Sequence, residues 1–271
     1  MIKKYDFLPY KFRKEEVALA PISWRKTMLD YSNFRKKAFK EEKPGTYVFL
    51  ATLLAAIVKH DRHLVNTAIE LTKDNVPKYF YLSLAGTALH DFGLKQEGLS
   101  MIREAVKQNP KHSILMNLAA ATSDLDEKEE LAKKVLTENP KDSDAAHHLA
   151  YAKYFKGERK EAESLFDEIL LNEPQNIYAL ESKGNIYFDR KEYDKALQQY
   201  LKIRLKPVPI QLQFKICHCY YLLRKIIKAK KIAKRLKDKL HLVYDLEMKV
   251  ENANELLAEI LKTKTSWFVK F

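Results

Sequence analysis

Apolar and polar residues alternate with the period of amphipathic helices over most of this chain. The densest apolar run, Tyr47 to Val58, is too short to span a bilayer and predicts a buried helix. Near the N-terminus, the segment ISWRKTMLDYSNFRKKAFKEE predicts one basic amphipathic helix. Residues 241–263 carry an apolar stripe that predicts a capping helix, with these side chains facing inward: Leu242, Leu246, Val250 and Leu257. The pattern therefore predicts an all-α protein.

Prolines punctuate the middle of the chain at nearly constant intervals. They stand at positions 77, 110, 140, 174 and 207, so that successive positions differ by 33, 30, 34 and 33. Because proline cannot continue a helix, each one marks a helix end. The unit from Lys111 to Pro140 has lost four residues, and we expect the loss at its turn, around Ser123 to Lys128.

Small residues recur in the same register between the prolines. One repeat upstream, the positions that correspond to Gly184, Ala196 and Tyr200 hold Ala150, Ala162 and Phe166. Two further repeats upstream, they hold Gly86, Gly98 and Ile102, so small residues match small ones and large apolar residues match large ones. The spacing predicts antiparallel helix pairs in which a small residue on each helix lets the other approach closely. The turn of a pair should hold a residue with positive φ, supplied by Gly93 and Gly157. Because one pair cannot bury its apolar face alone, the pairs should stack.

The last clear unit resembles the tetratricopeptide repeat. Residues of the signature types follow one another in the order Gly184, Tyr187, Ala196, Tyr200 and Pro207, although Leu180 stands where the pattern has Trp and Lys183 where it has Leu. The resemblance implies a right-handed superhelical solenoid of antiparallel helix pairs, with a concave groove that binds a peptide or helix of a protein partner. It implies a non-enzymatic adaptor within a larger assembly, or else a chaperone of a secretion or motility apparatus.

Three regions follow from these patterns. Residues 1–43 form an N-terminal arm and the basic helix, residues 44–240 form about six helix pairs, and residues 241–271 form the capping helix and a tail. The arm is aromatic, so we expect it to dock into its own groove or into that of a second copy, which would make a homodimer. Its apolar residues are Tyr5, Phe7, Leu8, Tyr10 and Phe12.

The first helix of each pair should line the groove. The register places Tyr154, Phe188 and Tyr221 in one row and Tyr151, Asn185 and His218 in a second. Rings and hydrogen-bonding groups together suit a peptide, although the same rings can instead pack between neighbouring helices. Asn185 is singled out because a core seldom holds an unpartnered amide. Glu181 stands where repeats that clamp acidic tails have Lys, which argues against that use.

A basic segment, residues 224–239, is the other candidate surface, in a chain whose formal charge is +13. The cations of this patch are Arg224, Lys225, Lys228, Lys231, Lys234 and Arg235. The residues expected to face the core are Ile226, Ile227, Ala229, Ile232 and Ala233. Such a face suits nucleic acid or an anionic surface, and it can also be a solvated face without a ligand.

Nothing in the sequence predicts catalysis, a cofactor or a metal site. We find no phosphate-binding loop, no nucleophile elbow and no zinc-type spacing. His60 and His63 share a helix face without an obvious third ligand, while Cys217 and Cys219 suit packed thiols rather than a redox pair. Two lone cysteines and no signal-peptide pattern favour a reducing, cytoplasmic location.

Overall fold

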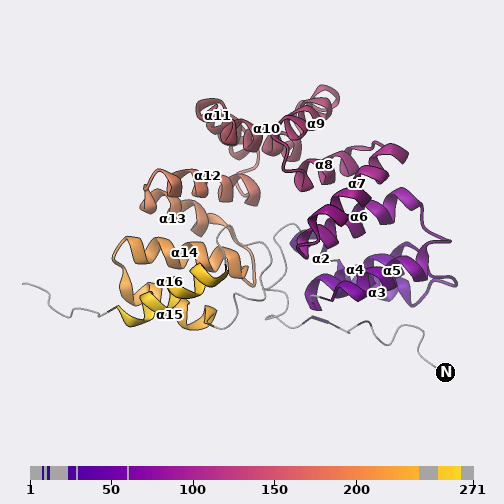
Figure 1. The fold of residues 1–271 in the computed structure, drawn as a ribbon, viewed down its shortest axis with the longest axis horizontal. Coiled ribbons are helices and arrows are strands. Elements are labelled where there is room, and N and C mark those ends of the chain that lie inside the picture. Colours follow the sequence, from indigo (N-terminus) through magenta and orange to yellow (C-terminus); the bar gives the residue numbers. More distant parts are fainter. Residues whose placement is uncertain are drawn as a thin grey trace, which may run out of the picture. The chain divides into compact units, whose positions relative to one another are not determined.

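The structure, a computed structural model, describes residues 8, 11–12, 24–28, 30–59, 61–237 and 250–263. All regular elements within these residues are helices, so the predicted all-α class is confirmed. The chain divides into two compact units, residues 1–165 and 166–271, each described here by itself (Figure 1).

The N-terminal segment forms two short helices rather than the single amphipathic helix expected. Helix α2 spans Arg25–Met28 and α3 spans Tyr31–Ala38. The chain turns at Asp30, whose carbonyl accepts the amides of Asn33 and Phe34 at 2.9 Å. The buried side chain of Trp24 is fixed by a tertiary contact, because its indole Nε1 donates to Asp91 at 2.7 Å. The prediction of one helix was therefore wrong.

Two residues of the N-terminal arm lie within the described part of the chain. Leu8 is buried, and its carbonyl accepts a hydrogen bond from Arg35 Nε at 3.3 Å. The Phe12 ring lies 4.0 Å from that of Tyr31. Both residues therefore pack on α3. Tyr5, Phe7 and Tyr10 lie outside the described residues.

The dense apolar run forms helix α4, Thr46–Lys59, which pairs with α5, Arg62–Thr72. Its side chains from Val48 to Val58 are buried, apart from Leu50, so the predicted buried helix is confirmed. Glu41 satisfies the start of α4, since its carboxylate accepts the amides of Gly45, Tyr47 and Val48 at 3.0 to 3.2 Å. Over the described residues, no helix combines the length and apolarity needed to cross a bilayer.

Within the described residues, five further helix pairs follow, and the predicted punctuation holds for each. Helix ends at Thr72, Gln108, Glu138, Asn172 and Lys202 precede the five prolines. The remaining helices are α6 (Lys78–Asp91), α7 (Lys95–Gln108), α8 (His112–Ala121), α9 (Leu125–Glu138), α10 (Ser143–Phe155), α11 (Arg159–Asn172), α12 (Ile177–Asp189), α13 (Tyr193–Lys202), α14 (Ile210–Leu222), α15 (Ile226–Leu236) and α16 (Val250–Lys262).

The small residues bring the helices of a pair into close contact, as expected. A Cβ added to Gly86 would lie 2.7 Å from the carbonyl oxygen of Gly98 on the partner helix. A Cβ on Gly184 would overlap the buried ring of Tyr200. Neither site has room for a larger side chain, which explains why the small residues recur.

Residues with positive φ recur in the turns with the period of the repeat. Gly93 and Gly157 have φ of 85° and 92°, which confirms the predicted role of both glycines. Lys191 and Arg224 take the same place in later turns with φ of 63° and 58°. An L residue is strained in this conformation because its Cβ crowds the following carbonyl.

Helix α15 turns Ala229, Ala233 and Leu236 toward the core. Ile227 is 68% exposed, so its predicted inward position was wrong. Residues two apart on a helix differ by about 200°, which places Ile227 almost opposite Ala229.

The capping helix α16 packs against α15 and buries Ala253, Leu257 and Ile260. The predicted inward position of Leu257 is therefore confirmed. Leu242, Leu246 and the side chain of Val250 lie outside what the structure describes.

Candidate functional site

The third helix pair is contracted, as predicted, but the loss lies at the end of α8 and not in the predicted stretch from Ser123 to Lys128. Helix α8 has 10 residues, whereas the first helices of neighbouring pairs, α6 and α10, have 14 and 13. The turn consists of residues 122–124, and Asp124 begins α9 by accepting the amides of Asp126 and Glu127 at 2.9 and 3.1 Å. The α6–α7 and α10–α11 turns have the same length, so the missing residues correspond to the last turn of α8.

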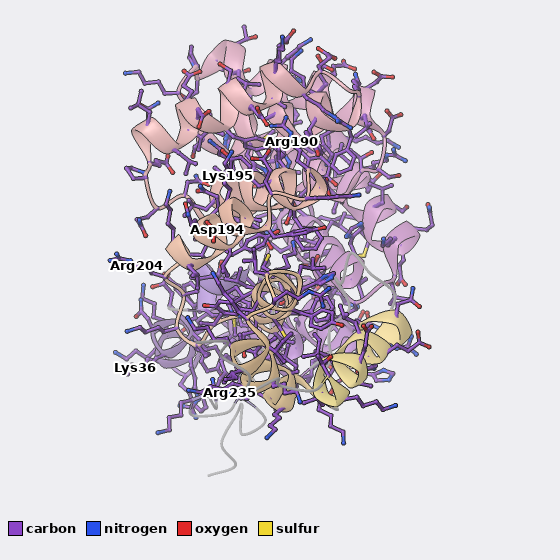
Figure 2. The ribbon with its side chains drawn as sticks, turned by 90° about the vertical axis from the view of Figure 1, so that its left-hand side faces the viewer. Lys36, Arg190, Asp194, Lys195, Arg204 and Arg235 are labelled. Atoms are coloured by element: carbon purple, nitrogen blue, oxygen red, sulfur yellow. The ribbon has the colours of Figure 1, made fainter. Side chains whose placement is uncertain are left out.

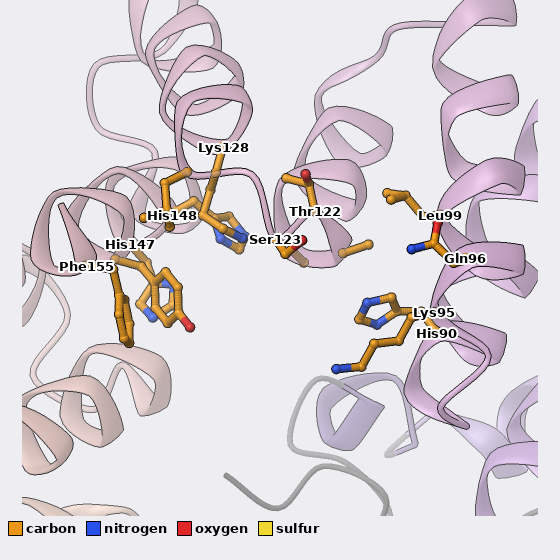
Figure 3. Close-up of a pocket in the computed structure, with 14 residues that line it drawn as sticks. His90, Lys95, Gln96, Leu99, Thr122, Ser123, Lys128, His147, His148 and Phe155 are labelled. Carbon is orange, nitrogen blue, oxygen red and sulfur yellow. The ribbon is translucent and has the colours of Figure 1, made fainter.

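A pocket of about 590 Å³ lies beside the shortened end of α8, within the first unit (Figure 3). We call it the α8 pocket. Its lining comes from α6 to α10 and the α8–α9 turn: His90, Lys95, Gln96, Leu99, Ala120, Ala121, Thr122, Ser123, Leu125, Lys128, His147, His148, Tyr151 and Phe155.

Lys128 occupies the position that small residues fill in the other pairs. Its register position is that of Gly98 in the preceding pair and of Ala162 in the following one, both of which are buried at the first helix. Lys128 itself is only 4% exposed, and its Nζ donates a hydrogen bond to the carbonyl oxygen of Ala119 near the end of α8. Its long side chain thus closes the end of a helix that lacks its last turn.

Sequence reasoning missed Lys128. The signal was available, because counting one full repeat back from Ala162 reaches this lysine.

Burial disfavours the charged form of the Lys128 amine. Desolvation lowers the pKa of Lys128 to about 8, against an opposing effect of the Glu127 carboxylate. That carboxylate is engaged elsewhere, since it accepts hydrogen bonds from Thr122 and, at 3.0 Å, from Arg103. The Lys128 ammonium also lies 5.3 Å from the centroid of the Tyr151 ring, within the range of a cation–π interaction.

Two histidines of α10 stand beside this lysine. The rings of His147 and His148 meet edge to face with centroids 5.4 Å apart. Burial, with the Lys128 charge as a further cause, lowers the pKa of His147 to about 4 and also lowers that of His148. Both rings are therefore neutral at pH 7, and the pocket lining holds cations and neutral polar groups without a carboxylate.

Aromatic rings form the other wall of the α8 pocket. Tyr151 is 39% exposed and Phe155 is 58% exposed, with ring centroids 4.6 Å apart. Of the predicted groove residues in this unit, Tyr151 therefore lines the pocket. Tyr154 does not belong to the lining, and its ring centroid lies 5.4 Å from that of Phe155. Phe155, which sequence reasoning did not select, is the most exposed of the three.

The predicted groove residues of the second unit contact residues on neighbouring helices. The rings of Phe188 on α12 and His218 on α14 lie 4.9 Å apart. Burial lowers the pKa of His218 below its ordinary value. The Tyr221 hydroxyl donates to Glu259 of the capping helix.

Asn185 belongs to a polar network within the second unit. Its Oδ1 accepts hydrogen bonds from Tyr200 at 2.7 Å and from Lys215 at 3.1 Å, and Lys215 also pairs with Glu181 at 3.1 Å. The assumption that the Asn185 amide has no partner was wrong. One of its partners, Lys215, belongs to the next helix pair.

The predicted basic patch lies on the surface of α15 and the turn before it. All six cations, from Arg224 to Arg235, lie at the surface, and Figure 2 labels Arg235 at the C-terminal end of the helix. Lys225 lies 3.7 Å from Asp194, and Lys228 lies 5.5 Å from the centroid of the Tyr220 ring. Within the described residues, this ion pair is the one that links the patch to a carboxylate.

The candidate metal and redox residues form no reactive centre among the described residues. No group of three or more potential metal ligands comes together there, and His63 is exposed while His60 lies outside the described part. Cys217 and Cys219 are free and buried, and burial raises the pKa of both thiols to about 12. They are packed thiols, as expected.

Comparison with known proteins identifies the repeat. Residues 119–186, which include the contracted pair, match the family model described as tetratricopeptide repeat. A tetratricopeptide repeat protein of Thermus thermophilus has a similar fold, with a TM-score of 0.54 and 17% identity over 68% of this chain and 98% of that one. A second one, from Parabacteroides merdae, gives a TM-score of 0.47 and 19% identity over 86% of this chain and 98% of that one. No curated protein matches the sequence. Residues 119–186 thus match a tetratricopeptide repeat, and the successive helix pairs have a fold similar to that of a tetratricopeptide repeat protein.

Proposed function

We propose that this chain is a non-enzymatic adaptor that binds a peptide or helix of a protein partner, and that the α8 pocket is a principal contact. The observation that carries the proposal is the exposed aromatic pair Tyr151 and Phe155 at the wall of a pocket. Exposed rings beside a cavity contribute a large contact area at low entropic cost, which is typical of the residues that dominate binding energy.

The second unit offers a further contact surface. Phe188 and His218 present rings in contact, and Asn185 sits in the network with Lys215 and Glu181. Because Glu181 balances Lys215, this surface lacks the unopposed cation that an acidic tail requires. We therefore do not extend the tail-clamp function of the family to this chain.

Selection of binding peptides from a random library tests the proposal without a known partner. The affinity of the selected peptides is then measured for the wild-type chain, for Tyr151→Ala/Phe155→Ala, and for the control Leu171→Ala. Leu171 is an 82% exposed apolar residue that is absent from the pocket lining. We expect the double variant to weaken binding by about 100-fold, as two hot-spot residues would.

The melting temperature separates loss of binding from loss of folding. Both aromatic residues are exposed, so their removal should leave the unfolding transition nearly unchanged. Peptides that bind the double variant and the wild-type chain equally well would refute the proposed contact.

The basic patch supports a second candidate function, binding to nucleic acid or to an anionic surface. Residues 224–237 contain no acidic residue, and the exposed side of α15 carries Lys228, Lys231, Lys234 and Arg235. Such binding releases counterions, so the affinity for a DNA duplex should fall steeply as the salt concentration is raised, and should fall further in Lys231→Glu/Lys234→Glu. An affinity that does not change with salt would reject this function.

A further inference from the structure

We propose that the α8 pocket binds the carboxylate of an Asp or Glu side chain of the partner peptide, with Lys128 as the counter-ion. This inference rests on the proposed function and names the chemistry of the group that the pocket takes.

The charge of the pocket supports an anionic occupant. Its lining combines Lys95 and Lys128 with three histidines and contains neither Asp nor Glu. Two carboxylates that flank lining residues in sequence are already engaged. Glu127 bonds to Thr122 and Arg103, and Asp91 bonds to Trp24 at 2.7 Å and lies 3.9 Å from His90.

Lys128 keeps donor capacity for a ligand. An ammonium group has three N–H donors. Within the described residues, its hydrogen-bond acceptor is the Ala119 carbonyl. A buried cation that lacks a full set of partners gains more from an incoming carboxylate than an exposed lysine does, because the surrounding dielectric is low.

The surroundings of Lys128 fit a carboxylate attached to an apolar group. Ser123 belongs to the pocket lining and carries a hydroxyl group (Figure 3). Tyr151 and Phe155 supply the aromatic wall. A short acid with an aromatic ring can therefore place its charge at Lys128 and its ring against the wall.

The position of Lys128 argues that the site is specific to this repeat. The corresponding residues of other second helices, Gly98, Ala162 and Ala196, carry no charge, and Lys128 is accommodated where α8 has lost its last turn. The same contraction thus provides both the space and the cation.

Protonation links binding to pH. The pKa of Lys128 without a bound anion is lowered to about 8. A bound carboxylate favours the charged amine, so affinity should be constant below this value and fall above it. His147 and His148 are neutral throughout that range, because their pKa values are lowered.

The probe is 3-phenylpropionate, and its uncharged analogue 3-phenylpropionamide is the control ligand. Both are titrated into the full-length, ¹⁵N-labelled chain and followed by amide chemical shifts. We compare the wild type with Lys128→Met, which keeps the aliphatic stem, and with Lys134→Met, which removes an exposed lysine of the same helix. Circular dichroism verifies that each variant is folded.

At pH 7 we expect the acid to bind at least 10-fold more tightly than the amide. Lys128→Met should reduce the affinity for the acid to that of the amide, and Lys134→Met should leave it unchanged. Raising the pH to 9.5 should weaken the binding of the acid to the wild type by about 10-fold and leave the binding of the amide constant.

Two results would overturn the proposal. One is equal binding of acid and amide, and the other is undiminished binding of the acid by Lys128→Met. The peptide selection distinguishes failure of this inference from failure of the proposed adaptor function. Peptides that require Tyr151 and Phe155 but tolerate amidation of every carboxylate would refute the inference and retain the adaptor function. Selection that yields no peptide, with the acid still bound at Lys128, would refute a peptide as the source of the carboxylate.

Discussion

The ammonium group of Lys128 donates a hydrogen bond to the backbone carbonyl of Ala119, nine residues earlier on the facing helix. The carbonyls of the last turn of a helix have no partner within that helix. In the contracted pair, a lysine from the second helix serves one of them, whereas the other pairs place a small residue at this position. The contraction therefore replaces an apolar contact by a buried cation.

Replacing this cation by methionine should stabilise the fold at pH 7. Lys128→Met keeps the buried stem and removes a charge that burial disfavours, with the loss of one hydrogen bond. We expect the free energy of unfolding to rise by about 1 kcal/mol. Urea denaturation measures it, with Lys128→Ala as the control that leaves a cavity and should destabilise. A less stable Lys128→Met would mean that the ammonium contributes more than it costs.

The advantage of Lys128→Met should reverse in alkali. The pKa of Lys128 is lowered from its ordinary 10.5 to about 8, so between these values the unfolded chain binds a proton that the folded chain does not. The free energy of unfolding of the wild type, relative to Lys128→Met, should therefore rise with pH, by about 3 kcal/mol over this interval. Denaturation at pH 7.5, 9 and 10.5 measures the difference, and a constant difference would refute the lowered pKa.

Lys191→Gly should stabilise the second unit. Lys191 has a φ of 63°, which costs an L residue about 1–2 kcal/mol, whereas glycine adopts it without strain. Since glycine gains entropy on unfolding, we expect a net increase of about 0.5–1 kcal/mol in the free energy of unfolding. The neighbouring Arg190 has a φ of −78°, so Arg190→Gly is the matched control and should destabilise. Equal effects of the two substitutions would contradict this account of the turn.

Gly184→Ala should destabilise the fold through Tyr200. A methyl group on Gly184 would overlap the Tyr200 ring, and this buried ring has no space to retreat. We expect a loss of about 1–3 kcal/mol, measured by urea denaturation. The same substitution in a Tyr200→Leu background should cost less, because the smaller side chain leaves room for the methyl group. Additive effects of the two substitutions would show that the contact is not the cause.

The helix pairs could be predicted from the sequence because their determinants are local. Pro77 and its counterparts end helices by their own covalent geometry, and Gly86 and Gly184 recur because nothing larger fits. The turn glycines Gly93 and Gly157 likewise report a backbone conformation rather than a distant contact.

The features that sequence reasoning missed depend on contacts between helices. Asn185 finds its partner Lys215 on the next helix pair. The break at Asp30 accompanies a contact between Trp24 and Asp91, which are far apart in the sequence. Lys128 escaped notice because a charged residue at a small-residue position makes sense only once α8 is seen to end early.

The most direct test of the proposed binding site is a variant in which the missing last turn of α8 is restored. Inserting Ala-Glu-Lys-Gly after Ala121, together with Lys128→Ala, should rebuild an ordinary helix pair and fill the α8 pocket. We expect the library-selected peptides to bind this variant at least 100-fold more weakly than the wild type, while its helix content and unfolding transition are retained. Unchanged peptide affinity in a folded variant would contradict the claim that the contracted helix pair creates the binding site.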